Sequence, residues 1–344
     1  MAERCSAVVF NGDGTWERHD DFDVPQPPPG GAVLAVEAVG LCHSDVAQLH
    51  GHKHVPGEVS PTVPGHEIVG RVHALAGDAD LGVTTGDRVA VNIVTYGEPS
   101  PVNPLGVRCY GYSFGLDEAE GLWGGYGEYM SVLPGTQLVP LTEEISPAEL
   151  TIFEPLSNVI AWLDRAKFRA GATVVVQGPG HMGLTCAAMA KHLGAGEVIV
   201  TGTGEDGLRL DVALEVGADR TIDVSVDDPV AVVAEATSGV MADVVVDLAS
   251  APSTPGLCLD LVRHGGQIYA SRVFQRGPLR DGNTGVPLAE ALGLEFPSQD
   301  CCQVGRVHDR TACIPEDVRD GGVLGKDGRG LRYCGHGGVP FSIG

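Results

Sequence analysis

The chain has 344 residues, enough for about two domains with substantial cores, and a formal net charge of −23. This acidity disfavours nucleic acid and anionic membranes as partners. No run approaches the roughly 18 apolar residues of a membrane helix, and the N-terminus lacks the apolar core of a signal peptide, so we expect a cytoplasmic protein. The nine cysteines are scattered, apart from Cys301 and Cys302, which favours reduced thiols or ligands over a disulfide framework.

Residues 1–150 are predicted to form a mostly β domain. Short apolar or alternating runs are separated by turn residues, and helical periodicity is scarce. The predicted strands are Ser6–Phe10, Ala32–Val39, Ile68–Ala74, Arg88–Val94 and Tyr126–Val132.

Residues 151–271 show a different pattern, in which strands and helices alternate. This alternation predicts a parallel sheet with helices on both faces, the doubly wound Rossmann architecture, so the fold class of the whole chain is α/β. The predicted strands are Thr173–Gln177, Glu197–Thr201, Thr221–Val224, Val244–Ala249 and Gln267–Ala270, and the predicted helices are Ala148–Phe168, His181–His192, Leu208–Val216 and Val230–Thr237.

The turn after the first of these strands has G-x-G-x-x-G spacing and leads into a predicted helix, which is the context that a dinucleotide-binding motif requires. Gly178 permits a tight exit from the strand, Gly180 lets the backbone approach a pyrophosphate, and Gly183 lets the helix pack on the strand. We therefore predict NAD(P) binding, with His181 and Met182 also at the cofactor. An ordinary glycine-rich turn is the alternative, because the chain has 49 glycines.

The end of the second Rossmann strand bears on the choice of cofactor. NAD enzymes place an acidic residue there, whereas this chain has Gly202 and Thr203, with Arg209 further on. A missing acid and a nearby arginine favour the extra phosphate of NADP. Glu205 lies just beyond, so NAD remains an alternative.

The first domain holds candidate metal ligands. Cys42, His66 and Glu67, with Glu154 at the domain boundary, supply the thiolate, imidazole and carboxylate groups that zinc accepts. Three protein ligands and an open position describe a catalytic zinc site. Their spacing alone leaves open a buried cysteine and a histidine that serve only the fold.

The residues around these candidates make a more specific pattern. Together they resemble the zinc-dependent medium-chain dehydrogenase/reductase family, which includes alcohol and sorbitol dehydrogenases, over residues 1–271. The resemblance implies a GroES-like catalytic domain before the Rossmann domain, and hydride transfer between an alcohol or polyol and NAD(P), with zinc as the Lewis acid. The matching motifs are G-x-C-H-S-D at Gly40–Asp45, P-G-H-E-x-x-G at Pro64–Gly70, G-D-R-V-A-V at Gly86–Val91, G-G-Y-G-E-Y at Gly124–Tyr129 and E-P-L-S at Glu154–Ser157.

By this resemblance Cys42 and His66 are zinc ligands, and Glu67 is either a ligand or the acid beside the ligands. Glu154 stands where alcohol dehydrogenases often have a second cysteine and sorbitol dehydrogenase-like members have glutamate. It would bind zinc directly or through water.

The resemblance also assigns roles to the residues that follow Cys42. Ser44 matches the hydroxyl that carries the substrate proton, and Asp45 matches the carboxylate that orients a metal-bound imidazole. A turn or cap role is the alternative for both residues. His43 would approach the cofactor pyrophosphate.

The chain departs from the family pattern in two places in the first domain. In many alcohol dehydrogenases the proton relay ends on a histidine at the position of Ala47, so His50, His52, His54 or water would have to substitute. The family's structural zinc lobe needs four cysteines near residues 95–115, where this chain has only Cys109. We therefore expect one zinc ion per chain.

Residues 272–344 form an atypical tail without clean periodicity, rich in arginine, cysteine and glycine. A reading-frame change near Ser271 and a divergent folded terminus are the alternatives. Two other functions remain in view: a zinc-free enone or quinone reductase of the same superfamily, and a non-catalytic dinucleotide-binding protein. The sequence fixes neither the alcohol nor whether the protein is a homo-oligomer.

Overall fold

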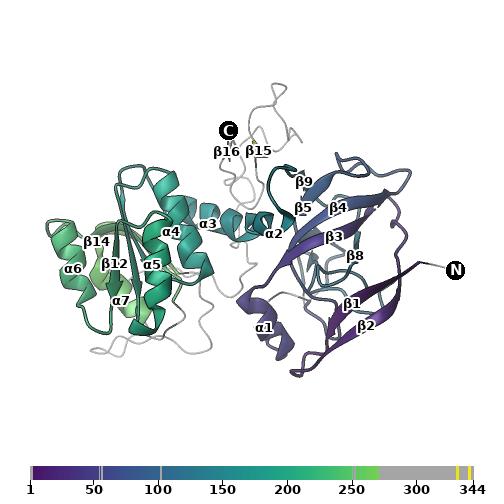
Figure 1. Cartoon of the computed structure of the whole chain (residues 1–344), viewed down its shortest axis with the longest axis horizontal. Coiled ribbons are helices and arrows are strands. Elements are labelled where there is room, and N and C mark those ends of the chain that lie inside the picture. Colours follow the sequence, from purple (N-terminus) through teal and green to yellow (C-terminus); the bar gives the residue numbers. More distant parts are fainter. Residues whose placement is uncertain are drawn as a thin grey trace. The chain divides into compact units, whose positions relative to one another are not determined.

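The computed structural model describes residues 3–53, 55, 57–100, 103–249, 251, 253–270, 331–332 and 340–341. The chain divides into two compact units, Met1–Glu154 and Pro155–Gly344. The first is mostly β and the second alternates strands with helices (Figure 1), so the predicted fold class is confirmed.

The first unit is built on an antiparallel five-stranded sheet with the order β8-β3-β4-β5-β9. Two antiparallel pairs, β1 with β2 and β6 with β7, complete its β structure. The bounds are β1 (Arg4–Phe10), β2 (Trp16–Asp23), β3 (Ala32–Gly40), α1 (His43–Leu49), β4 (Glu67–Leu75), β5 (Arg88–Val91), β6 (Val94–Tyr96), β7 (Val107–Cys109), β8 (Tyr129–Val132), β9 (Leu138–Pro140) and α2 (Pro147–Leu150).

The pairing of β3 with β4 brings two distant parts of the sequence together. Gly40, the last residue of β3, lies opposite Glu67, the first residue of β4. Helix α1 begins directly after β3, and His66 directly precedes β4. The start of α1 and the start of β4 therefore lie at the same end of the sheet.

Aromatic packing supports the segment that follows β7. The rings of Tyr110, Phe114 and Trp123 are mutually stacked, with centroids 4.8–6.4 Å apart, and the Arg108 guanidinium lies 3.7 Å from the Phe114 ring centroid. Cys109 is fully buried beside them. This segment overlaps residues 95–115, where the family's structural zinc lobe would lie, and its contacts are of the kind that hold protein cores together.

The second unit contains a parallel sheet with the order β12-β11-β10-β13-β14. The order reverses between β10 and β13, and ligands of doubly wound sheets bind at such a switch point. The bounds are α3 (Phe153–Arg165), β10 (Thr173–Gln177), α4 (His181–His192), β11 (Glu197–Gly202), the 3₁₀ turn η1 (Gly204–Asp206), α5 (Gly207–Glu215), β12 (Arg220–Asp223), α6 (Pro229–Ala236), β13 (Ala242–Asp247), α7 (Thr254–Leu261) and β14 (Val262–Ala270).

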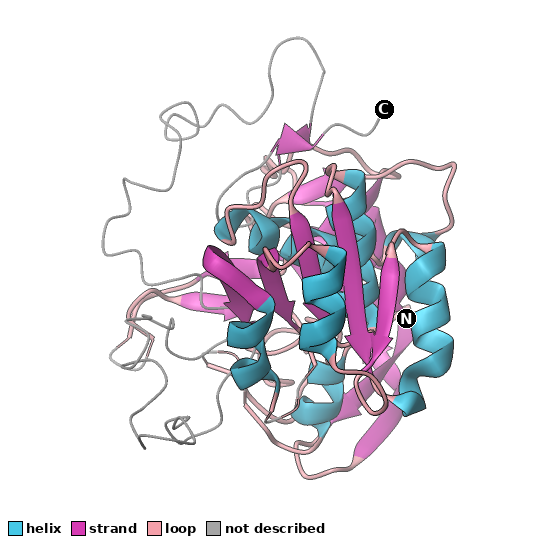
Figure 2. Ribbon diagram, turned by 90° about the vertical axis from the view of Figure 1, so that its left-hand side faces the viewer, coloured by secondary structure: helices cyan, strands magenta, loops and turns pink. Residues whose placement is uncertain are grey.

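Helices cover both faces of this parallel sheet, as Figure 2 shows with helices in cyan and strands in magenta. Because side chains alternate along a strand, Val174 and Val176 pack with α3, α4 and α5, whereas Val175 packs with α6 and α7. Because both faces of these strands are buried, their sequences are nearly continuous runs of valine and isoleucine.

Several elements were not predicted from the sequence. Strand β2 is mostly exposed and polar, so it lacks an apolar pattern. Helix α1 spans only two turns, and its N-cap residue is a cysteine, which is an unusual cap. Helix α7 runs directly into β14, which begins five residues before the predicted start. The tail beyond Ala270 lies outside the described residues, except for the paired strands β15 (Leu331–Arg332) and β16 (Pro340–Phe341).

Candidate active site

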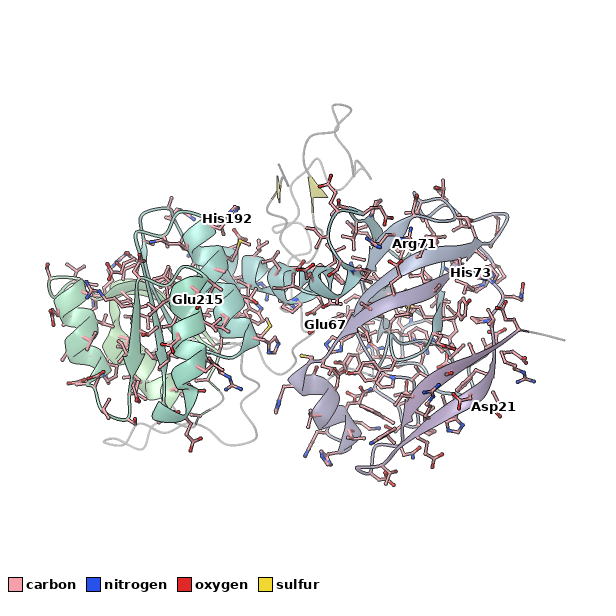
Figure 3. The ribbon with its side chains drawn as sticks, in the orientation of Figure 1. Asp21, Glu67, Arg71, His73, His192 and Glu215 are labelled. Atoms are coloured by element: carbon pink, nitrogen blue, oxygen red, sulfur yellow. The ribbon has the colours of Figure 1, made fainter. Side chains whose placement is uncertain are left out.

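Three predicted metal ligands converge at the end of the antiparallel sheet. One ligand atom each from Cys42, His66 and Glu67 lies within 4.8 Å of the others. His66 and Glu67 are buried, and Cys42 is half-buried. Figure 3 labels Glu67 at the start of β4, beside the start of α1. Ligand atoms of a tetrahedral zinc ion are about 3.3–3.8 Å apart, so small movements would suffice to close this cluster on an ion.

The start of α1 is fixed by a reciprocal cap between Cys42 and Asp45. The Cys42 N–H donates to Asp45 Oδ2 over 2.8 Å, and the Asp45 N–H donates to the Cys42 carbonyl over 3.1 Å. This is the geometry of a capping box, in which a carboxylate three residues into the helix satisfies the cap residue. The cap thus presents the Cys42 thiol at the helix N-terminus, where the helix dipole favours a thiolate.

Asp45 also contacts the second ligand. Its Oδ1 lies 3.2 Å from His66 Nδ1, and its Oδ2 accepts a hydrogen bond of 3.1 Å from the Tyr126 hydroxyl. Asp45 thus makes contacts of both kinds, those of a helix cap and those with the His66 imidazole. One carboxylate therefore links two of the predicted ligands, Cys42 and His66. Its role in orienting a metal-bound imidazole stays a prediction.

A tyrosine hydroxyl lies near the same imidazole nitrogen. The Tyr112 hydroxyl is 3.0 Å from His66 Nδ1 and donates to Ser44 Oγ over 3.0 Å. Ser44 Oγ itself lies 3.4 Å from His66 Nε2. The predicted proton-carrying serine thus lies next to a predicted ligand, and both contact a tyrosine that the sequence did not single out.

The charges around His66 favour a cation. Burial lowers the pKa of this imidazole, but side-chain hydrogen bonds with Asp45 and Cys42 and the negative charge of Glu154 outweigh it, and the pKa is held well above its ordinary value. Glu154 is thus close enough to act on His66 electrostatically, although it does not belong to the cluster of ligand atoms. Its role as a direct or water-mediated ligand stays a prediction.

Two glycines make room for the buried side chains of this cluster and its surroundings. A Cβ on Gly40 would lie 1.8 Å from Glu67 Oε2, and a Cβ on Gly65 would lie 2.6 Å from the Tyr126 ring. Gly65 also has a φ of +95°, which favours glycine. The thiol, imidazole and carboxylate donors, together with a backbone shaped around the carboxylate, fit a zinc ion.

The glycine turn of the second unit has the geometry expected of each glycine. Gly178 has a φ of +94°, and a Cβ there would lie 2.7 Å from Ala249 at the end of β13. A Cβ on Gly183 would lie 1.9 Å from the Gly178 carbonyl oxygen, whereas one on Gly180 would meet nothing within 4 Å. Gly180 is the N-cap of α4, so open space lies in front of a helix N-terminus, as a pyrophosphate requires.

His181 and Met182 form the first turn of α4, and His181 is exposed. At the end of β11, Gly202 is buried and Thr203 is the N-cap of η1. Asp206 accepts hydrogen bonds from the Thr203 N–H and hydroxyl, each 3.0 Å, and pairs with Arg209 over 3.0 Å. Arg209 is exposed. The Asp206 carboxylate would compete with a cofactor phosphate for its guanidinium.

The remaining site predictions have simpler outcomes. His43 is exposed at the first position of α1, and its role at the cofactor stays a prediction. His50 and His52 are also exposed, and His54 lies outside the described residues. Tyr112 was not singled out from the sequence, and Tyr126 was given no role although it lies in the motif at Gly124–Tyr129. A tyrosine in a glycine-rich stretch carries no signal of which polar groups its hydroxyl contacts.

Comparisons with known proteins identify the family of this chain. Residues 28–143 match the family model of the alcohol dehydrogenase GroES-like domain, and residues 182–274 match that of zinc-binding dehydrogenases. A protein of Mycobacterium tuberculosis described as "Probable alcohol dehydrogenase" is 38% identical over 268 residues, 73% of this chain and 71% of that protein. An erythritol/L-threitol dehydrogenase of Mycolicibacterium smegmatis is 32% identical over 292 residues, 80% of this chain and 78% of that protein.

A solved structure from Sinorhizobium meliloti 1021, bound to NADP, shares the fold with a TM-score of 0.68 and 27% identity, covering 78% of this chain and 76% of that one. The chain belongs to the zinc-type medium-chain dehydrogenase family, with a GroES-like domain and a Rossmann domain. It is an oxidoreductase of the alcohol dehydrogenase type. Among the described residues, every helix is too short or too polar to cross a bilayer.

Proposed function

We propose that this protein is a zinc-dependent dehydrogenase that transfers hydride between an alcohol or polyol and NAD(P). The observation that carries the proposal is the convergence of Cys42, His66 and Glu67 ligand atoms within 4.8 Å. A zinc-free enone or quinone reductase has no use for such a cluster. A non-catalytic dinucleotide-binding protein has no use for it either.

Cys42, His66 and Glu67 would hold the zinc ion, with Glu154 nearby as a further carboxylate. When bound, zinc supplies a Lewis acid that makes an alcohol easier to deprotonate, and NAD(P) supplies the hydride acceptor. Asp45 holds the Cys42 backbone and the His66 ring in place. Ser44 would receive or return the proton of the substrate hydroxyl. Gly178, Gly180 and Gly183 shape the turn and the α4 N-terminus that would bind the cofactor pyrophosphate.

Zinc content tests the metal part of the proposal. Elemental analysis of protein washed with a mild chelator should find about one zinc per chain, because the three ligands belong to one site. The Cys42→Ser variant should lose this zinc and the alcohol-dependent reduction of NAD(P). Full activity in Cys42→Ser would instead support the zinc-free reductase, and cofactor binding without activity in the wild type would support the non-catalytic protein.

We propose NADP as the preferred cofactor, since no acidic residue stands at Gly202 or Thr203 and Arg209 lies one helical turn beyond Glu205. Arg209 forms an ion pair with Asp206, and binding the NADP phosphate would have to break or share that pair. The Arg209→Ala variant should raise the KM for NADP about tenfold and leave the KM for NAD nearly unchanged, because only NADP carries the extra phosphate. An equal effect on both cofactors would contradict this assignment.

A polyol is the substrate class to test first, since one relative is an erythritol/L-threitol dehydrogenase. Linear polyols, secondary alcohols and primary alcohols should be compared at equal concentration with both cofactors. A higher kcat/KM for polyols would support this class, and a preference for simple alcohols would leave the reaction type intact but remove the polyol assignment.

A further inference from the structure

The hydroxyl of Tyr112 lies between two groups of the proposed site. It is 3.0 Å from Ser44 Oγ and 3.0 Å from His66 Nδ1, and the tyrosine is only 3% exposed. We infer that Tyr112 is a positioning residue, whose hydroxyl bridges Ser44 and His66 and directs the hydrogen of Ser44 towards the substrate oxygen. The inference rests on the proposed function and deepens it.

The direction of the hydrogen bonds follows from the groups that face His66 Nδ1. This nitrogen faces the Tyr112 oxygen at 3.0 Å and Asp45 Oδ1 at 3.2 Å. A carboxylate can only accept, so His66 Nδ1 carries a proton whether the ring is neutral or a cation. The Tyr112 oxygen then also serves as an acceptor for this proton, and its own hydrogen is donated to Ser44.

The bond from Tyr112 determines what Ser44 can do. A serine hydroxyl has one hydrogen, and an oxygen that already accepts from Tyr112 turns that hydrogen elsewhere. The other acceptor near Ser44 Oγ is His66 Nε2 at 3.4 Å, the nitrogen that would be left for zinc. With Nε2 engaged in this way, Ser44 would donate to a substrate oxygen as negative charge develops on it, which is where a fixed hydrogen-bond donor lowers a barrier. In many alcohol dehydrogenases a histidine at the position of Ala47 ends the proton relay. Ala47 has no polar group, so in this protein the Tyr112 hydroxyl would be a hydrogen-bond partner of Ser44 instead.

The backbone holds Tyr112 in this position from several sides. The Gln48 amide donates to the Gly111 carbonyl over 2.8 Å, which ties α1 to this segment, and the Val59 N–H donates to the Tyr112 carbonyl over 3.0 Å. Gly111 packs so closely on Gly65 that a Cβ would lie 2.6 Å from the Gly65 carbonyl oxygen. His66 follows Gly65 in the chain. The Tyr112 ring is therefore fixed against the His66 imidazole, with ring centroids 5.1 Å apart.

A double-mutant cycle tests the inference in the active enzyme. Tyr112→Phe keeps the ring and removes the hydroxyl, so kcat for alcohol oxidation should fall about fivefold to tenfold with KM within about twofold, the scale of one hydrogen bond. In a Ser44→Ala background the same change should cost nothing further, because Tyr112 acts through Ser44. Tyr110→Phe is the matched control, since it removes a buried hydroxyl two residues away that bonds Thr136 and Leu133 instead.

A spectroscopic readout does not depend on activity. The ¹⁵N resonances of the His66 ring, assigned by their loss in His66→Gln, should shift in Tyr112→Phe and stay in place in Tyr110→Phe. If Tyr112→Phe fails to fold, 3-fluorotyrosine at position 112 retains the hydroxyl, and its ¹⁹F resonance should shift in Ser44→Ala.

Unchanged His66 resonances in Tyr112→Phe, an unchanged ¹⁹F resonance in Ser44→Ala, or an equal loss of kcat in both backgrounds would overturn the inference. A wild-type protein that oxidises no alcohol would refute the proposed function instead, and the His66 resonances alone would then decide the role of Tyr112.

Discussion

Glu67 Oε2 lies where a side chain on Gly40 would have to begin. The two residues are register partners across β3 and β4, and a Cβ on Gly40 would stand 1.8 Å from that oxygen. The absence of a side chain at Gly40 is thus what allows a buried carboxylate to lie against the backbone beside Cys42 and His66.

The Gly40→Ala variant should therefore lose the site. Its Cβ displaces the Glu67 carboxylate or separates the strands, and overpacking of this kind costs about 1–3 kcal/mol. We expect a lower urea midpoint and weaker zinc retention against a chelator. Gly77→Ala is the matched control, because a Cβ there meets nothing within 4 Å. Normal zinc retention in Gly40→Ala would show that Glu67 does not need this space.

Two variants of the glycine turn in the Rossmann unit should affect different properties, one the stability of the unit and the other cofactor binding. Gly183→Ala places a Cβ 1.9 Å from the Gly178 carbonyl oxygen and should destabilise the unit, whereas Gly180→Ala meets nothing within 4 Å and should fold normally. Gly180→Ala should nevertheless weaken cofactor binding about tenfold or more, because the methyl group stands where the pyrophosphate approaches. Thermal unfolding and titration with NAD(P)H check both expectations. Wild-type affinity in Gly180→Ala would count against this binding mode.

Cysteine reactivity should differ sharply along the chain. Burial raises the pKa of Cys186 to about 12, and burial and the charge of Asp247 raise that of Cys258 to about 12. At pH 8 only about one part in ten thousand of such thiols is ionised, so neither should react with iodoacetamide in the native protein. The half-buried Cys42 should react faster, and added zinc should protect it. Pulsed alkylation and peptide mass spectrometry measure these rates, and rapid native labelling of Cys186 would contradict its burial.

One acid-sensitive contribution to stability lies between α4 and β12. Burial raises the pKa of Asp219, but hydrogen bonds from Lys191 at 2.6 Å and from the Val198 N–H outweigh it, and the net pKa is lowered. A lowered folded-state pKa stabilises above the unfolded value, about 4, and the contribution is lost as the pH falls through the folded value.

Asp219→Asn should accordingly lower the free energy of unfolding at pH 7 by less than about 1 kcal/mol, because this pair is partly exposed. The difference from the wild type should shrink below about pH 4. Urea unfolding at both pH values, with the exposed Asp211→Asn as the control, measures it. A difference that grows on acidification would have the wrong sign for this mechanism.

The elements predicted from the sequence are those whose pattern of apolar side chains reflects their burial. Val174–Val176 are apolar on both faces because both faces of β10 are covered, and the prediction of that strand is confirmed. Strand β2 is one exposed partner of a two-stranded pair, so its residues carry no burial pattern to read. Family motifs located Cys42, His66 and Glu67, and the register of β3 with β4 brings them together. Tyr112 could not be found in this way, because its contacts depend on the path of the backbone between β7 and β8.

The stacked rings of Tyr110, Phe114 and Trp123 have a practical consequence for handling this enzyme. They support the segment that carries Tyr112 by packing on one another, and none of the three belongs to the proposed zinc ligands Cys42, His66 and Glu67. A strong chelator should therefore empty the proposed catalytic site and leave that segment folded. Cobalt or cadmium could then be introduced in place of zinc by simple dialysis, which would give the centre a colour or a nuclear spin through which its chemistry can be followed.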